Sequence, residues 1–319
     1  MEKFRDLLRL ARWQNVLMIA MVVYVMEKWV VTPLLSVAYF GEQLPWYVLL
    51  LMTIGWCLIA AGGYVINDYF DVKIDAINRP DRLIITRTVS KQQAMTYYRL
   101  LTILGIVCGI VGAWLLKSWI LGLLFVFVPG LLWFYSASYK RLLLIGNLTV
   151  ALVTGVTPLL VAIGNVAYLN LRYGNINGIN VLEYTTLPHD IFIWTGGFAA
   201  FAFLSTLIRE IIKDMEDQMG DREMECHSLP IVWGELPTKI IVTVLLALMS
   251  AAISWLAWRV IPSPLTTRYA LFGLLVPIAC VLYLLWMARI PSDYRTAQRV
   301  MKFVMLMGVL FSFCVTRVL

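Results

Sequence analysis

The amino-acid sequence predicts an all-α membrane protein with nine transmembrane helices. Of its 319 residues, 61% are hydrophobic and 14% are charged, and the mean hydropathy is +0.80, whereas soluble domains carry roughly 25% charged residues. Long segments hold no charged residue, among them 48–61, 100–116 and 240–256. Transmembrane barrel strands would alternate polar and apolar residues. These segments do not alternate, so we expect helices, which satisfy their own backbone hydrogen bonds in lipid.

A helix needs about 20 mainly apolar residues to cross the hydrocarbon. Before the first such segment, MEKFRDLLRLARW spreads its charges along an amphipathic stretch, which favours an interfacial helix over a cleavable signal peptide. A long loop at 165–190 separates the fifth and sixth segments. We expect residues 1–319 to form one transmembrane domain. Its spans are expected near residues 15–35, 45–66, 97–116, 119–136, 143–164, 191–209, 239–258, 269–288 and 301–318.

The lysines and arginines predict the orientation in the membrane. If odd spans run outward and even spans return, 20 of the 26 basic residues lie on the side of the N-terminus. The positive-inside rule then places the N-terminus in the cytoplasm, and we expect the protein to lie in the cell membrane. This asymmetry explains the net charge of +7, and a nucleic-acid partner is not needed.

The acidic residues are concentrated in two places. Four follow the second span and eight follow the sixth, so that two regions on the predicted cytoplasmic side hold 12 of the 19. In the first cluster, Asn67, Asp71 and Asp75 are spaced i, i+4, i+8, which stacks them on one helical face at about 6 Å per step. In the second, Asp214, Asp217 and Asp221 are spaced i, i+3, i+7 and again share a face.

Such columns of carboxylates repel one another unless a cation lies between them. Mg²⁺ relieves this repulsion and favours a few carboxylates together with phosphate oxygens. Solvated helix ends would explain a single aspartate, but not two columns accompanied by basic residues. Carboxylates that hold metal ions beside cations that bind phosphate are typical of a metal-bound diphosphate site. The basic companions are Arg79, Arg82, Lys140, Arg141, Lys213 and Arg222.

Both motifs resemble signatures of the UbiA family of intramembrane prenyltransferases. NDYFDVKIDAINRPDR, from Asn67, resembles the first signature, and REIIKDMEDQMGDREMECHSLPIVWG, from Arg209, resembles the second. The resemblance implies a helical bundle around a central cavity, capped by aspartate-rich cytoplasmic loops at about 67–96 and 210–237. It also implies Mg²⁺, an isoprenyl diphosphate as prenyl donor, and a hydrophobic or phosphate-bearing acceptor in the membrane lipid.

Residue roles carry over from the family's motifs position by position. The resemblance implies catalytic roles for Asn67, Asp71, Asp75, Asp217 and Asp221. It implies metal binding by Asp71, Asp75, Asp214, Asp217 and Asp221. Substrate binding is expected of Arg79, Arg82, Tyr135, Lys140, Arg141 and Lys213. Phe70, Trp133, Phe134 and Tyr135 either face the allylic cation with their rings or pack against neighbours.

The sequence leaves open other acceptors for the prenyl group and other classes of membrane protein. The segment from Arg209, with its KDMED and GDR elements, is more similar to enzymes that prenylate glyceryl-phosphate ethers than to those that prenylate 4-hydroxybenzoate or dihydroxynaphthoate. An ion-coupled transporter is a different-class alternative, because acidic groups near membrane helices often mark ion pathways. Against it, the carboxylates cluster at span ends. A phosphatidyltransferase would need an Asp-Gly signature that these clusters lack. Cys226 and His227 stand alone, so we expect no metal site there.

Overall fold

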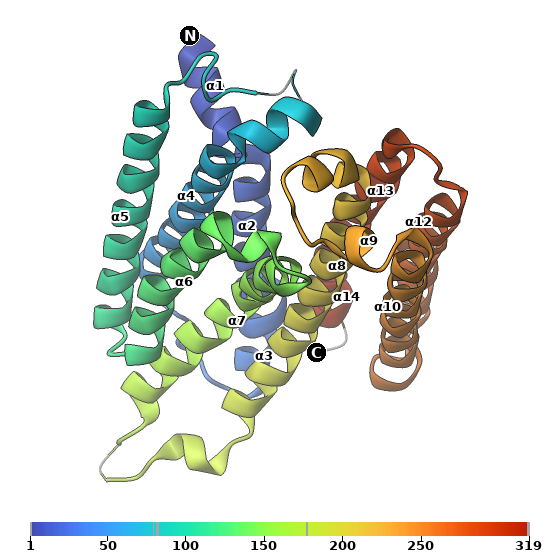
Figure 1. The fold of residues 1–319 in the computed structure, drawn as a ribbon. Helices are drawn as coiled ribbons and strands as arrows, with labels where there is room; N and C mark the ends of the chain where they lie inside the picture. Colours follow the sequence, from blue (N-terminus) through green and yellow to red (C-terminus); the bar gives the residue numbers. More distant parts are fainter. Residues whose placement is uncertain (1, 79, 81–82, 177, 318–319) are drawn as a thin grey trace. The chain divides into compact units, whose positions relative to one another are not determined.

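A computed structural model describes residues 2–78, 80, 83–176 and 178–317. Within these residues the regular structure is helical, and nine segments are long and apolar enough to cross a membrane, as the sequence predicts (Figure 1). Five of them are single α-helices: α4 (Trp46–Asn78), α5 (Lys91–Leu115), α6 (Trp119–Ala137), α7 (Ile145–Tyr173) and α8 (Leu187–Glu223).

The other four spans are compound. The first joins α2 (Trp13–Val25), the π-helical turn η1 (Met26–Val31) and α3 (Thr32–Val37), and the seventh joins α10 (Glu235–Trp255) and η5 (Leu256–Val260). The eighth comprises α11 (Pro264–Tyr269), η6 (Ala270–Leu275) and α12 (Val276–Met287), and the last α13 (Pro291–Leu310) and α14 (Ser312–Thr316). The short helices are α1 (Glu2–Leu10), η3 (Tyr139–Arg141), η4 (Val181–Tyr184) and α9 (Leu229–Val232).

Two helices continue past the ends that the sequence predicts. The loops expected from residues 67 and 210 are wrong at their starts, because α4 runs to Asn78 and α8 to Glu223. The α8 extension is rich in Glu, Lys, Met, Gln and Arg, residues that favour helices even without an apolar face. Pro80 follows shortly after the end of α4, as is usual where a helix stops. The motif aspartates therefore lie on helices.

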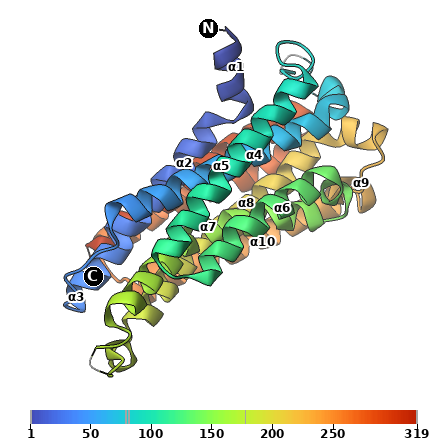
Figure 2. The same ribbon diagram turned by 90° about the vertical axis from the view of Figure 1, so that its left-hand side faces the viewer.

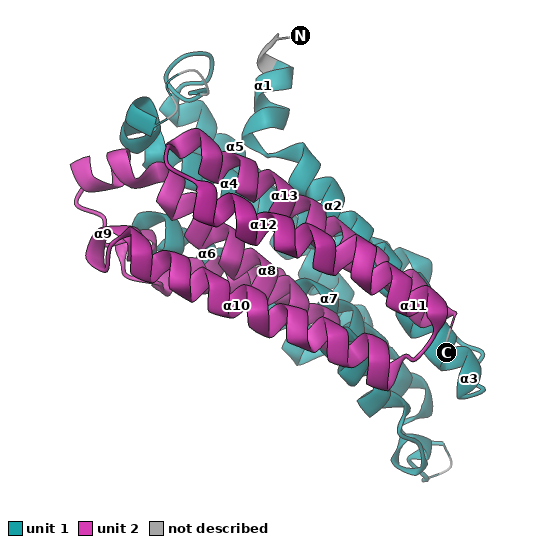
Figure 3. Cartoon of the chain, turned by 90° about the vertical axis from the view of Figure 1, so that its right-hand side faces the viewer, with its two compact units in different colours: residues 1–139, 157–196 teal, residues 140–156, 197–319 magenta. Residues whose placement is uncertain are grey.

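The chain divides into two compact units, shown in Figure 3. Unit 1 comprises residues 1–139 and 157–196, and unit 2 comprises residues 140–156 and 197–319. Helices α7 and α8 contribute residues to both units. The first aspartate motif belongs to unit 1 and the second to unit 2.

In unit 1, α4 packs against α2, α5 and α6, and Figure 2 shows α2, α4 and α5 side by side. Glycine permits the close approach of α5 to α6, since a Cβ atom added at Gly109 would lie 2.0 Å from Cγ of Phe125. Phe125 is fully buried and meets the ring of Trp56 edge-on at 5.7 Å. Trp56 donates from Nε1 to Thr157 Oγ1 over 3.0 Å. These contacts hold α4 in register with its neighbours.

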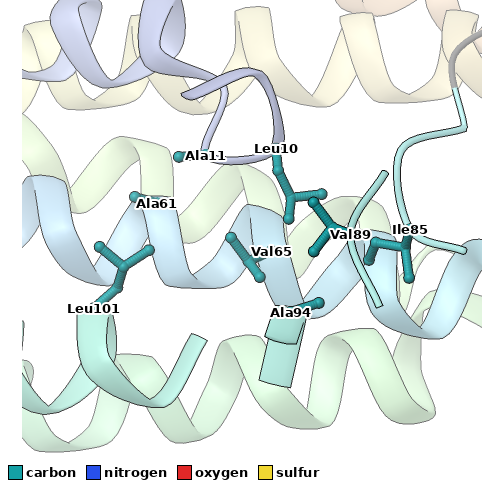
Figure 4. Packing of buried hydrophobic residues seen from close by; sticks show 8 residues of the cluster. All are labelled: Leu10, Ala11, Ala61, Val65, Ile85, Val89, Ala94 and Leu101. Carbon is teal, nitrogen blue, oxygen red and sulfur yellow. The ribbon is translucent and has the colours of Figure 1, made fainter. Parts of the chain in front are cut away.

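A second apolar cluster lies near the first aspartate motif. The end of α1 packs on α4, on the loop before α5 and on α5 itself (Figure 4). Helix α5 begins with a capping box, in which Ser90 and Gln93 exchange backbone-to-side-chain hydrogen bonds of 3.2 Å. The expected N-terminal helix is confirmed as α1. The cluster consists of Leu10, Ala11, Ala61, Val65, Ile85, Val89, Ala94 and Leu101.

The loop expected at 165–190 is shorter than predicted, because α7 continues to Tyr173 and α8 begins at Leu187. An ion pair fastens this end of unit 1. Arg172 donates from Nε and Nη2 to the two carboxylate oxygens of Glu42, each over 2.6 Å. These hydrogen bonds lower the pKa of Glu42 below its usual value.

In unit 2, α12 and α13 pack against each other and α10 packs against α12. A buried lysine joins three elements at one end. Lys239 Nζ lies 2.9 Å from Glu235 on its own helix and donates to the carbonyl of Ala288 over 3.0 Å. Tyr294 of α13 donates its hydroxyl to Glu235. Because each polar group has a partner, the buried charge is compensated.

Candidate active site

The first motif forms a polar column near the end of α4. Asn67 and Asp71 are each 7% exposed, and Nδ2 of Asn67 donates to Oδ2 of Asp71 over 2.8 Å. The other amide oxygen, Oδ1 of Asn67, is buried and has no hydrogen-bond partner among the described residues. Asp75 follows one helical turn later and is half-buried. Oxygen-only donors of this kind suit a hard cation such as Mg²⁺.

Asp68 belongs to the same motif but has a different role. Its Oδ1 accepts a hydrogen bond from Nη2 of Arg12 over 2.8 Å. Arg12 also lies over the ring of Tyr64, 4.8 Å from its centroid. Arg12 stands between α1 and α2 and has a left-handed backbone with φ of 49°. The Asp68 carboxylate thus ties the N-terminal segment to α4.

The aromatic residues near this motif pack on one another. Phe70 meets Trp133 edge-on at 5.6 Å and Tyr69 at 5.4 Å, and Trp133 also lies 5.5 Å from Tyr98. Of the two roles expected for Phe70 and Trp133, the structure thus shows packing against neighbouring rings. Phe134 instead stacks on Tyr139 at 6.1 Å and is 56% exposed. Tyr135, at the same end of α6, is half-buried. Arg79 and Arg82 lie outside the described residues.

The second motif lies on the last turns of α8. Asp214, Asp217 and Asp221 are all helical and half-buried, so their expected helical spacing is confirmed. Asp221 lies close enough to Asp217, Lys140 and Lys213 for their charges to act on its carboxylate. Unit 2 thus brings Asp217, Asp221, Lys140 and Lys213 of the predicted site together.

Asn147 is a site residue that the sequence reasoning missed. Its Nδ2 donates to Oδ2 of Asp214 over 2.7 Å, from the first turn of α7. The signal was a lone amide side chain in an otherwise apolar predicted span, a position where polar groups usually join helices. Asn147 holds Asp214 as Asn67 holds Asp71. An amide therefore steadies one carboxylate in each motif.

The cationic residues of unit 2 have defined neighbours. Arg209 pairs with Glu210, and Lys213 Nζ lies 3.7 Å from Oε2 of the same carboxylate. The backbone carbonyl of Arg141 accepts a hydrogen bond from the amide of His227 over 2.9 Å. This bond joins the η3 turn, which ends with Lys140 and Arg141, to the loop that follows α8. Basic residues therefore accompany the second motif as the sequence predicts.

The predicted ligands are divided between the two units. Asn67, Asp71, Asp75 and Tyr135 belong to unit 1. Lys140, Arg141, Lys213, Asp214, Asp217 and Asp221 belong to unit 2. Over the described ranges, no three His, Cys, Asp or Glu side chains are grouped closely enough to hold a metal ion by themselves. Metal binding by these residues stays a prediction.

Comparison with known proteins gives a family and a fold. The model of the UbiA prenyltransferase family matches residues 13–308. A digeranylgeranylglyceryl phosphate synthase from Methanobrevibacter smithii is 31% identical over 258 residues, which cover 79% of this chain and 80% of that protein.

Two solved structures are similar to the whole chain. A UbiA homolog from Aeropyrum pernix aligns with a TM-score of 0.62 and 16% identity over 92% of this chain and 96% of its own. A UbiA homolog from Archaeoglobus fulgidus bound to DMAPP and Mg²⁺ aligns with a TM-score of 0.56 and 14% identity over 98% and 100%. These similarities confirm the predicted nine-helix fold.

Proposed function

Because the chain belongs to the UbiA prenyltransferase family, and is therefore an integral membrane prenyltransferase, we propose that its acceptor is a prenylglyceryl phosphate. The relative from Methanobrevibacter smithii bears the name of an enzyme for such a lipid. The segment from Arg209 to Arg222 carries the KDMED and GDR elements that favour this branch. The observation that supports the acceptor most directly is the 31% identity to this relative over 79% of the chain, while the arrangement of Lys140, Lys213, Asp217 and Asp221 in unit 2 supports a diphosphate as the donor's leaving group.

The donor of the reaction is an isoprenyl diphosphate. Breaking its allylic C–O bond leaves a delocalised cation and a diphosphate anion, and bound Mg²⁺ supplies stabilisation of the anion's developing charge. Asp71 and Asp75 of the first motif would hold such ions, as would Asp214, Asp217 and Asp221 of the second. Oδ1 of Asn67, which has no hydrogen-bond partner among the described residues, would offer a further oxygen ligand beside Asp71.

The remaining residues bind and orient the substrates. Lys140 and Lys213 act on the Asp221 carboxylate and are placed to neutralise phosphate oxygens. Apolar helices exclude water, so that the cation meets the acceptor first. A phosphate-bearing acceptor needs cations beyond those that bind the diphosphate. Arg87, Arg141 and Arg222 supply them, and Arg87 and Arg222 are exposed.

We place this chemistry at the cytoplasmic face of the cell membrane. Both motifs lie at the ends of even-numbered spans, on the side that holds 20 of the 26 basic residues. The donor and a phosphate-bearing acceptor have polar headgroups, which can reach the motifs from this face while their chains stay in the lipid.

The acceptor is tested by comparing prenyl transfer to acceptors of different chemical classes. Purified protein in lipid nanodiscs is supplied with Mg²⁺, radiolabelled geranylgeranyl diphosphate and one acceptor at a time: geranylgeranylglyceryl phosphate, 4-hydroxybenzoate or dihydroxynaphthoate. We expect label in the glyceryl phosphate product alone, and none with excess chelator. Efficient prenylation of an aromatic acid without the ether lipid would contradict the acceptor assignment. Absence of transfer to every acceptor would contradict the function.

A further inference from the structure

The end of α8 that carries the second motif needs support from the rest of unit 2. From Glu210 to Glu223 the helix continues beyond the predicted end of the sixth span. Adding residues to an existing helix avoids the cost of nucleation, so the segment can continue α8 as a helix by itself. Tertiary contacts are still needed to fix the direction in which its aspartates point.

Glu216 makes the most extensive of these contacts. It is 7% exposed although it lies between two aspartates of the motif. Its Oε1 accepts a hydrogen bond from Nε of Arg295 over 2.8 Å, and its Oε2 accepts one from Nε2 of Gln298 over 2.6 Å. Both donors lie on α13, spaced i, i+3 on one face. Each carboxylate oxygen of Glu216 is thus bound to α13.

The position of Glu216 on the helix separates it from the motif aspartates. At about 100° per residue, Asp217 lies about 100°, Asp221 about 140° and Asp214 about 160° from Glu216 around the helix axis. The three aspartates therefore span about 60°, and Glu216 faces away from them. A contact at Glu216 fixes the rotation of α8 without occupying the face that carries the ligands.

We propose that Glu216, Arg295 and Gln298 form a positioning clamp that sets the rotation and height of the aspartate face of α8. Glu216 is a positioning residue in this assignment and not a metal ligand, because Arg295 and Gln298 bind its oxygens. The proposal rests on the proposed function, since it takes Asp214, Asp217 and Asp221 as the ligands that are positioned. Asn147 adds a second restraint through Asp214.

The clamp predicts a specific defect when it is broken. Releasing Glu216 lets the end of α8 turn or shift, and a misplacement of about 1 Å can cost about 100-fold in rate. The ligand charges themselves are unchanged. We therefore expect weaker metal binding and a lower kcat in variants whose motif aspartates are intact. General destabilisation of unit 2 would not weaken metal binding selectively.

The experiment compares Glu216→Gln with Glu235→Gln. Glu235 is a matched control because it also accepts a hydrogen bond from α13, through Tyr294, but lies on α10 and not on the helix that carries the motif. Binding of Mn²⁺ in the presence of inorganic diphosphate is titrated by the EPR signal of free Mn²⁺. Hydrogen–deuterium exchange of residues 210–223 is measured in parallel, together with kcat and KM for the prenyl diphosphate.

We expect Glu216→Gln to raise the Mn²⁺ dissociation constant at least fivefold, to lower kcat at least tenfold and to speed exchange at 210–223. Glu235→Gln should leave all three close to the wild-type values. Arg295→Lys, which retains a positive charge opposite Glu216, should recover part of the loss seen in Arg295→Met. Equal Mn²⁺ affinity in the two glutamine variants would overturn the clamp.

Two safeguards keep the result decisive. If Glu216→Gln does not fold, Gln298→Leu removes only a neutral donor, and an unchanged Mn²⁺ affinity in that variant would also overturn the clamp. If the wild-type protein transfers no prenyl group, the proposed function fails. The Mn²⁺ titration and the exchange of residues 210–223 then still test the clamp.

Discussion

The carboxylates in the two motifs have different partners. These partners separate the predicted metal ligands from carboxylates that hold segments of the chain together. Asp71 is bound by an amide, Nδ2 of Asn67, and Asp214 by Nδ2 of Asn147. A neutral amide orients a carboxylate without neutralising its charge, so the carboxylate keeps its affinity for a cation. Asp68 and Glu216 are instead bound by arginines. Their charge is already compensated, which suits a structural role.

We predict that Asp71→Asn and Asp217→Asn each lower prenyl transfer roughly a thousandfold, which corresponds to about 4 kcal/mol of transition-state energy. Each change removes a ligand charge while preserving the shape of the side chain. The rate is measured with labelled diphosphate, and folding is checked by gel filtration in detergent. Asp190→Asn is the matched control on α8, because Asp190 bonds Thr186 at the far end of this helix. Near-normal rates in either motif variant would refute the ligand assignment.

Asp68 should behave differently from its neighbour. Asp68→Asn weakens a partly exposed ion pair with Arg12, so we expect a loss of about 1 kcal/mol in stability and less than a tenfold fall in kcat. Arg12→Gln should lose at least as much, because it also removes the contact with the ring of Tyr64, and the double variant should lose little more than Arg12→Gln alone. Thermal unfolding and the rate of prenyl transfer check these values. A thousandfold rate loss in Asp68→Asn would instead make Asp68 a ligand.

At the scale of helices, the sequence located both motifs and their helical spacing but ended α4 and α8 too early. Hydropathy detects the part of a helix that lies in lipid, and the charged residues of each extension lower its mean hydropathy even though apolar residues such as Ile211 and Met215 are buried there. The partners of the motif residues were also hidden. Asn147 is 67 residues from Asp214, and Arg295 is 79 residues from Glu216. No local pattern connects such pairs, whereas the spacing of Asp214, Asp217 and Asp221 is a local property.

Helix packing in unit 1 provides a test of the fold that is independent of the chemistry. At Gly109 an added Cβ would lie 2.0 Å from Cγ of the fully buried Phe125, whereas at Gly130 nothing lies within 4 Å. Overpacking a tight core typically costs about 1–3 kcal/mol. We therefore expect Gly109→Ala to lower the midpoint of thermal unfolding by several degrees, and Gly130→Ala to leave it unchanged or raise it. A Gly109→Ala protein as stable as Gly130→Ala would contradict this packing.

At the scale of the whole molecule, most charged residues lie on the same predicted side of the membrane as the two aspartate motifs. The family model matches residues 13–308, so nearly all of the chain takes part in one membrane-embedded architecture. Within it, 16 of the 26 basic residues and 12 of the 19 acidic residues lie at the ends of even-numbered spans or in the segments that join them to the next span. The segments on the other side hold few charges, and Glu42 and Arg172 bind each other there. One side thus carries both the motif carboxylates and most of the basic residues.

This asymmetry leads to a prediction about topology. The 20-to-6 division of basic residues orients the chain with a cytoplasmic N-terminus, because cytoplasmic loops are enriched in lysine and arginine. An odd number of spans then puts the C-terminus outside. Residues 39 and 184 should face the exterior, since they follow the first span and precede the sixth. Residues 88 and 223 should face the cytoplasm, beside the two motifs.

Cysteine labelling tests this orientation with single introduced sites in a background without the five native cysteines. Tyr39 and Tyr184 are 96% and 83% exposed, and Thr88 and Glu223 are also exposed, so each position is accessible from the solvent on its own side. In intact cells, an impermeant maleimide should label Tyr39→Cys and Tyr184→Cys. It should label Thr88→Cys and Glu223→Cys only after permeabilisation. Labelling of either motif site from outside would invert the topology and would place the diphosphate site on the wrong side for a cytoplasmic donor.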